Sequence, residues 1–168
     1  MVNVNIKMII AAAVLGVAGI LVLFWYFQSD EARIKKRFKS IAELASKSGE
    51  EHELTAAVSA KKIGDMFADP CRIEIPSYNI SRTYAKKDIP AHVMGARSRY
   101  SDISMKFHDI DIDFPEEGIA RVTLTAYVEA VWISGEAVRE VHEIACWLEK
   151  IEKDWFFNQI EVVTVLER

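Results

Sequence analysis

The sequence predicts an α+β protein in which three helices pack on a curved, mainly antiparallel sheet, preceded by one transmembrane helix. Three observations lead to this prediction. An uncharged, mostly apolar run occupies residues 8–27. The apolar residues that follow recur at helical spacing, and from about residue 101 onward they alternate with a period of two. Helices followed by a series of strands are typical of the α+β class.

The apolar run is long enough to cross a membrane as a helix. About twenty residues at 1.5 Å each span roughly 30 Å, the thickness of the hydrocarbon core. A signal peptide has a shorter core and ends in small residues at a cleavage site. This run instead ends in the aromatic residues 24–27, as in an interfacial belt. We therefore expect a short tail at 1–7 and an uncleaved anchor at 8–27 that binds the lipid bilayer, a cleaved or buried segment being the alternative.

The charges that flank the run bear on its orientation. Only Lys7 precedes it, whereas five basic residues lie within 33–39. The positive-inside rule then places the following domain in the cytoplasm. A very short N-terminal tail favours export of the domain instead, and the basic residues also fit the wet face of a helix. We expect a single-pass protein of a bacterial inner membrane, with the extracytoplasmic side slightly favoured and the cytoplasmic side left open.

Residues 28–168 are predicted to form one domain, because about 140 residues suffice for a single core. The formal net charge of −4 argues against nucleic acid as the main partner, since phosphate binding needs a clustered basic surface. Cys71 and Cys146 are the two cysteines, and they fit either one disulfide or two buried thiols.

Three helices are predicted in the first part of this domain. The first covers about 30–46 and is ended by Ser48-Gly49, and the second runs from about Leu54 to Phe67, where Asp69-Pro70 stops it. The third begins at Asp88-Ile89-Pro90, which offers a cap and a first-turn proline. Its predicted inward face consists of Ile89, Val93, Ala96 and Tyr100.

The strands are predicted from alternation. Two short strands fall at 71–75 and 80–85, and a four-strand meander begins near residue 101. The apolar parity changes at His108-Asp109, which indicates a β-bulge. After a turn at 115–118, further strands cover 120–133, 138–151 and 155–166.

The final hairpin carries a family resemblance. The segment IEKDWFFNQIEV at 151–162 has a charged turn, then Trp155, then a strand ending in Ile-Glu-Val. In this segment and in the order of elements over about 33–167, the chain resembles the nuclear transport factor 2-like superfamily (cystatin-like, polyketide cyclase-like). The resemblance implies a cone-shaped domain whose bent sheet wraps over three helices.

Strand parity then suggests a pocket. The apolar face of strand 120–132 includes three alanines, which leave room, and Trp132 near one end. The next strand turns His142 inward, where desolvation disfavours its charged form. Enzymes of the resembling superfamily, such as ketosteroid isomerases, use a pocket Asp or His as an acid–base group. By that analogy His142 is the first catalytic candidate, and Trp132, His142, Tyr84 and Tyr100 form the candidate ligand pocket, with a satisfied core or rim histidine as the favoured alternative.

Metal and cofactor chemistry finds no support in the sequence. Asp109, Asp111 and Asp113 alternate along one strand, but they lack the glycine and the downstream glutamate of a calcium loop, so a solvated strand face is favoured. The histidines and cysteines have no metal-ligand spacing. We therefore expect no metal and no cofactor.

Two functions remain. The favoured one is a membrane-anchored, non-catalytic binding or assembly module, a homodimer or a partner of another membrane-complex protein. Its predicted interface is the mixed outer sheet face: Arg121, Thr123, Thr125, Tyr127 and Val131. The alternative is a carrier or acid–base enzyme for a small apolar ligand in the cone. An open cavity beside His142 would favour the alternative.

Overall fold

The computed structural model of the protein describes residues 15–17, 19 and 29–167, apart from the side chains of Tyr78 and 164–167. Within this part of the chain, no helix has the length and apolar character needed to cross a membrane. The anchor predicted at 8–27 falls almost wholly outside the described residues. The chain divides into two compact units, 1–34 and 35–168, and the fold given below is that of the second unit.

Three helices and six strands make up the described fold. In chain order they are α2 (Asp30–Ala45), α3 (Glu53–Gly64), β1 (Phe67–Ile75), β2 (Ile80–Tyr84), α4 (Ile89–Arg97), β3 (Tyr100–Glu116), β4 (Ile119–Trp132), β5 (Ala137–Ile151) and β6 (Asp154–Glu167). Short 3-10 turns at Pro76–Tyr78 and Lys86–Asp88 flank β2.

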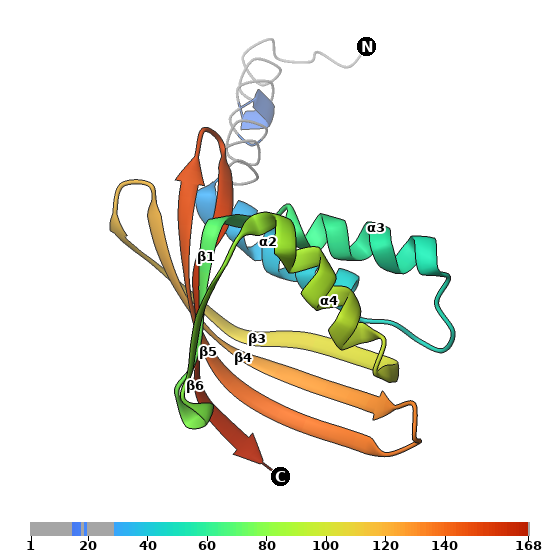
Figure 1. The fold of residues 1–168 in the computed structure, drawn as a ribbon. Coiled ribbons are helices and arrows are strands. Elements are labelled where there is room, and N and C mark those ends of the chain that lie inside the picture. The colour runs from blue at the N-terminus through green and yellow to red at the C-terminus, as the bar shows by residue number, and fades with distance from the viewer. Residues whose placement is uncertain (1–14, 18, 20–28, 168) are drawn as a thin grey trace, which may run out of the picture. The chain divides into compact units, whose positions relative to one another are not determined.

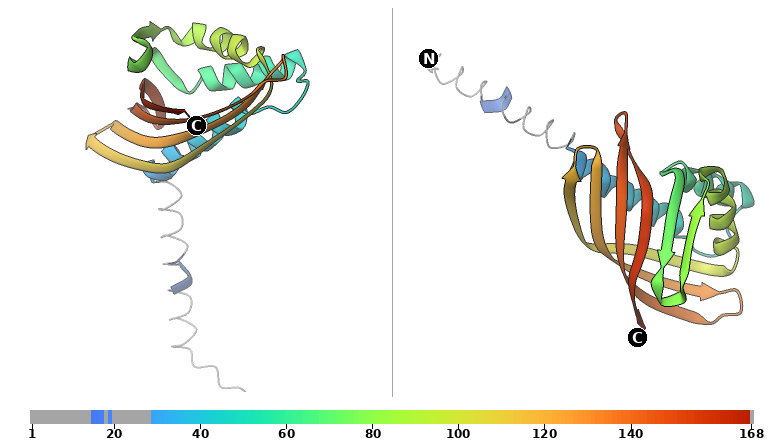
Figure 2. Two further views of the ribbon diagram at one scale, coloured as in Figure 1. Left: turned by 90° about the horizontal axis from the view of Figure 1, so that it is seen from below. Right: turned by 60° about the vertical axis from the view of Figure 1, so that its left-hand side comes forward.

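The strands form one sheet in the order β2-β1-β6-β5-β4-β3 (Figure 2, right). The last four strands are an antiparallel meander, and β1 pairs antiparallel with β2 and parallel with β6. The sheet is curved, and α3, α4 and the part of α2 from Lys35 onward lie on its concave side (Figure 1). The predicted α+β architecture of helices on a curved, mainly antiparallel sheet is confirmed.

The core lies between the helices and the concave face of the sheet. In β4 the inward parity predicted from alternation holds, since Ala120, Val122, Leu124, Ala126 and Ala130 are all buried. The bulge in β3 is also confirmed. The β3–β4 register shifts between His108 and Asp111, where Asp109 has a φ of 53°.

The end of the second helix was predicted wrongly. α3 stops at Gly64, and Phe67 already begins β1, so Asp69 and Pro70 lie inside a strand. The strand accommodates this proline because its register against β6 shifts between Phe67 and Arg72, and an irregularity of this kind is where a strand tolerates proline.

The inward face of the third helix was wrong in part. α4 begins with Pro90 in its first turn as expected, and Ile89 is buried, but Ala96 is exposed and the buried residue at the helix end is Arg97. Tyr100 belongs to β3, where it pairs with Trp132. The predicted helical face extended too far, because α4 ends at Arg97 and Tyr100 already belongs to the next strand.

Candidate functional site

A cavity of about 440 Å³ lies on the concave face of the sheet. Side chains of α2, β1 and the four meander strands line it, and almost all of them are apolar. The exceptions are Glu140, His142 and the thiol of Cys146, all on β5. A cavity of a few hundred Å³ with apolar walls and few polar groups is typical of small-molecule sites.

One part of the cavity wall consists of closely packed phenylalanine rings. The ring of Phe38 meets Phe107 edge to face at 5.6 Å and Phe157 at 5.1 Å, and Phe67 lies 5.5 Å from Phe157. Phe38 and Phe157 are only 2% and 1% exposed. Edge-to-face packing of this kind adds specific geometry to hydrophobic burial, so this part of the wall is well defined.

Other parts of the wall remain accessible to solvent. Ile41, Met105, Val128 and Ile144 are half-buried although they line an apolar cavity. Ala126 is the register partner of His142, and its small side chain leaves room beside the imidazole. The cavity is therefore open, with apolar surface that a ligand would cover.

Glu140 and His142 form the polar part of the site. Residues two apart on a strand share a face, and the Nε2 atom of His142 lies 2.8 Å from Oε2 of Glu140. A carboxylate only accepts hydrogen bonds, which assigns the proton of a neutral imidazole to Nε2. The Nδ1 atom is buried and has no hydrogen-bond partner within the described structure. The side chain of Glu140 is 45% exposed and that of His142 17%, so Glu140 is the more accessible of the two.

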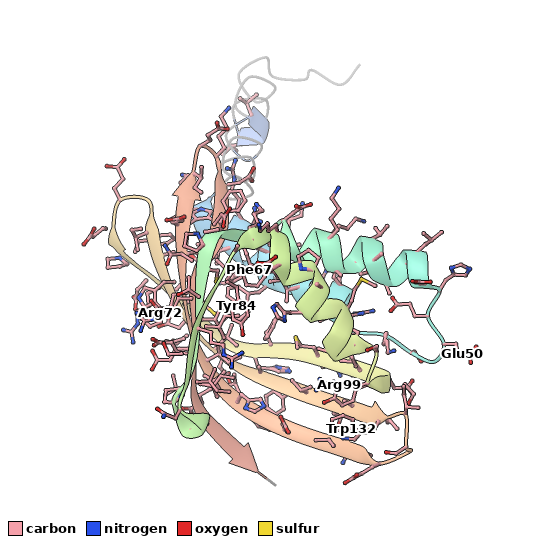
Figure 3. The ribbon with its side chains drawn as sticks, viewed as in Figure 1. Glu50, Phe67, Arg72, Tyr84, Arg99 and Trp132 are labelled. Carbon is pink, nitrogen blue, oxygen red and sulfur yellow. The ribbon has the colours of Figure 1, made fainter. Side chains whose placement is uncertain are left out.

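The other three predicted pocket residues lie elsewhere. Trp132, at the end of β4 (Figure 3), packs against Tyr100 with the two rings tilted by 36° and their centroids 4.3 Å apart. Tyr84, on β2, packs edge to face on His92 at 4.9 Å. None of the three lines the cavity around His142. His142 is thus the one predicted pocket residue that the structure brings to this cavity.

Glu140 is a site residue that the sequence reasoning missed. It has the same parity on β5 as His142, Ile144 and Cys146, and it is the register partner of Val128. That parity was the available signal. The prediction turned His142 inward but did not extend to Glu140, two positions earlier on the same face.

The two cysteines are buried and carry free thiols in the structure. Burial raises the pKa of Cys71 to about 12. Burial also raises the pKa of Cys146, and the nearby Cys71 adds to that effect. Neither thiol is therefore a ready nucleophile near neutral pH, because the thiolate is the reactive form.

The aspartates of β3 make no metal site. Asp109, Asp111 and Asp113 are all exposed, on a strand whose Ile110 and Ile112 are half-buried. Across the described residues, no group of three or more His, Cys, Asp or Glu side chains is placed to hold a metal ion. The aspartates lie on the solvent-exposed face of the strand, and the isoleucines between them lie on its half-buried face.

Neither the known family models nor the curated proteins include a match to this chain. Solved structures do match. A candidate scytalone dehydratase from Novosphingobium aromaticivorans is similar with a TM-score of 0.64 and 14% identity, over 83% of this chain and 87% of that one. A hexachlorocyclohexane dehydrochlorinase, LinA-type3 from Novosphingobium barchaimii, gives 0.62 and 8%, over 82% and 89%. A protein of Caulobacter vibrioides with a cystatin-like fold gives 0.58 and 12%, over 82% and 87%.

The chain has this cone fold. Identities this low establish the fold alone, and the fold that the resemblance implied is confirmed, since one of these neighbours is described by its cystatin-like fold. In this cone the cavity occupies the hollow of the sheet, between its bent strands and α2.

Proposed function

We propose that the protein binds a small, largely apolar molecule in the cavity of its cone, in a domain that an anchor at 8–27 holds at a membrane. The open cavity carries this proposal. Its half-buried apolar side chains remain in contact with water, and covering them is favourable by roughly 25 cal/mol for each Å² removed from solvent. One neighbour in fold, the dehydrochlorinase, is named for a small apolar substrate, hexachlorocyclohexane.

This proposal changes the preference that the sequence alone suggested. A non-catalytic assembly module needs no cavity, whereas the structure contains one with polar groups at one place in its wall. A homodimer, or a complex with another membrane protein through the outer sheet face, remains a prediction. Sedimentation of the detergent-solubilised chain tests it.

Acid–base catalysis is the second candidate function. The hydrogen-bonded pair of His142 and Glu140 at the wall of an apolar cavity is placed to exchange a proton with a bound substrate through the more exposed carboxylate. In this case His142→Gln would abolish turnover and leave ligand binding nearly unchanged. Ligand binding by the native chain without any turnover would favour the carrier.

The ligand-binding proposal is tested by release of bound molecules from the full-length chain. The chain is purified in two unrelated detergents, denatured, and analysed by mass spectrometry. Val128→Phe places a ring in the cavity, whereas Val163→Phe adds the same ring at a position that is 51% exposed on β6. We expect one molecule in both detergents from the native chain and from Val163→Phe, and none from Val128→Phe. No released molecule, or equal release from both variants, would overturn the proposal.

The membrane part of the proposal rests on the sequence of 8–27. The chain should remain with membranes through an alkaline carbonate wash, and removal of residues 8–27 should release it. Reporter fusions at the C-terminus then give the orientation, for which we expect the extracytoplasmic side. A cytoplasmic reporter signal would contradict that orientation without affecting the cavity.

A further inference from the structure

Among the described residues, the carboxylate of Glu140 is paired with His142 at the cavity and with no lysine or arginine. Within the described structure, the one side chain that the carboxylate contacts through a hydrogen bond is His142, whose Nε2 lies 2.8 Å away. The adjacent Arg139 pairs with Glu129 at 3.1 Å instead, and Lys106, which lines a neighbouring groove with Glu140, forms no ion pair with it. Within the described part of the chain, no lysine or arginine neutralises Glu140.

The surroundings of this carboxylate favour a positive charge. On one side it borders the apolar wall, and in the register of the sheet its partner on β4 is Val128. The carboxylate is 45% exposed, and a ligand that covered it would remove it from water, which is costly unless the ligand supplies a positive charge. A neutral imidazole supplies one N–H, which orients the carboxylate but leaves its charge uncompensated.

We propose that the cavity selects a small apolar amine, whose ammonium group binds Glu140 while its apolar body covers the wall. The strand register shows which side chains such a ligand would cross. Glu140 on β5 is paired with Val128 on β4, which is paired with Met105 on β3. The neighbouring row of paired residues consists of His142, Ala126 and Phe107. A ligand that starts at Glu140 therefore passes over small aliphatic side chains to an aromatic ring. This inference rests on the proposed function, since it names the ligand class of the same cavity.

In this arrangement His142 is a positioning residue. Its Nδ1 is buried, so the imidazole meets the ligand less directly than the carboxylate that it holds. The proton on Nε2 fixes one carboxylate oxygen and leaves the other for the ammonium group. The charge of Glu140 therefore selects amines, and the hydrogen bond from His142 orients the carboxylate toward the ligand.

The test compares three probes of one shape and three polar ends: 4-phenylbutylamine, 4-phenylbutanol and 4-phenylbutanoate. Their affinities for the full-length chain in zwitterionic nanodiscs are measured by calorimetry, with empty nanodiscs as the reference. We expect the amine to bind at least tenfold more tightly than the alcohol, and the carboxylate to bind least. Val128→Phe should abolish binding of the alcohol, which shows that the probes occupy the cavity.

Two variants, each of which removes one negative charge from β5, distinguish a direct effect of Glu140 on amine binding from a general effect of net charge. Glu140→Gln should reduce amine affinity at least tenfold, to the level of the alcohol, and leave the alcohol within threefold. Glu143→Gln, at an exposed position on the opposite face of β5, should leave the order of the three probes unchanged. His142→Gln should narrow the preference for the amine without removing it.

The outcomes distinguish this inference from the function on which it rests. Equal affinity for amine and alcohol, with both blocked by Val128→Phe, would overturn the ligand class and leave ligand binding intact. An amine preference that survives Glu140→Gln would also overturn the assignment. Failure of all three probes to bind would contradict the proposed function as well.

Discussion

The guanidinium group of Arg97 donates to both carboxylate oxygens of Glu51, at 2.8 and 2.7 Å, while only 4% of Arg97 is exposed. The same group donates to the carbonyls of Leu44 and Ala45, at 2.5 and 2.7 Å, where α2 ends. A cation that binds the last carbonyls of a helix satisfies otherwise unpaired acceptors and complements the helix dipole. Arg97 thus ties the end of α4 to the end of α2 and to the loop that follows it.

Removal of Arg97 should cost much of the domain's stability. Arg97→Met leaves the carboxylate of Glu51 unpaired and two helix carbonyls without a donor, so we expect the free energy of unfolding to fall by about 3–5 kcal/mol. Glu51→Gln keeps the shape and one acceptor oxygen, and about 1.5–3 kcal/mol is expected. Chemical denaturation followed by tryptophan fluorescence measures both. If the double variant loses the plain sum of the two, the residues are not coupled and this interpretation of the pair is wrong.

Substitution of alanine for glycine should lower the stability of the fold at Gly64 and raise it at Gly95. A Cβ atom on Gly64 would lie 2.8 and 2.9 Å from the Cγ and Cδ atoms of Pro90, so Gly64→Ala forces α3 away from α4. We expect a loss of about 1–3 kcal/mol. Gly95, inside α4, has no atom within 4 Å of such a Cβ, and Gly95→Ala should stabilise the helix by about 0.5–1 kcal/mol. Thermal unfolding of the two variants checks the sign, and a shift in the same direction would contradict the packing described here.

The aromatic part of the cavity wall should depend on Phe38. Phe38→Ala removes a ring that packs edge to face on Phe107 and Phe157, and a loss of about 3–5 kcal/mol is expected. Phe114→Ala is the matched control, because Phe114 is 48% exposed, and it should cost far less. Equal losses in denaturation experiments would show that the Phe38 cluster does not stabilise the fold.

Much of the sheet could be predicted because alternation is a local property. The side of a strand on which a residue lies follows from counting by two, and this placed His142 on the inward face of its strand and the bulge at His108-Asp109. The same count reaches Glu140, two positions before His142, although the prediction did not extend to it.

Other features depend on contacts between distant segments, which a single sequence does not reveal. Tyr100 was expected in the pocket as part of a helix, but the β3–β4 register places it against Trp132. The partners of Arg97 lie about fifty residues away, at the end of another helix. Helical spacing identifies apolar faces, and it has no signal for a buried arginine. The curvature of the sheet, which decides whether a cavity stays open, is likewise a property of the assembled strands.

The buried thiols should make the fold sensitive to alkaline pH. Burial raises the pKa of Cys71 from 9.0 to about 12, so in this interval the unfolded chain loses the proton while the folded chain keeps it. The unfolded state then binds fewer protons, and stability falls as pH rises, beginning near pH 9 and continuing to about pH 12. Below that interval the effect of the thiol on stability is constant.

Cys71→Ala isolates this effect from the titration of lysines and tyrosines in the same range. At about pH 8 the variant should be less stable than the native chain, because a small cavity replaces the thiol. At about pH 10.5 the deficit should shrink or reverse, since the native chain alone bears the cost of keeping Cys71 protonated. Urea denaturation at the two pH values measures the change. A deficit that stays constant would mean that Cys71 titrates normally in the folded protein, which its complete burial argues against.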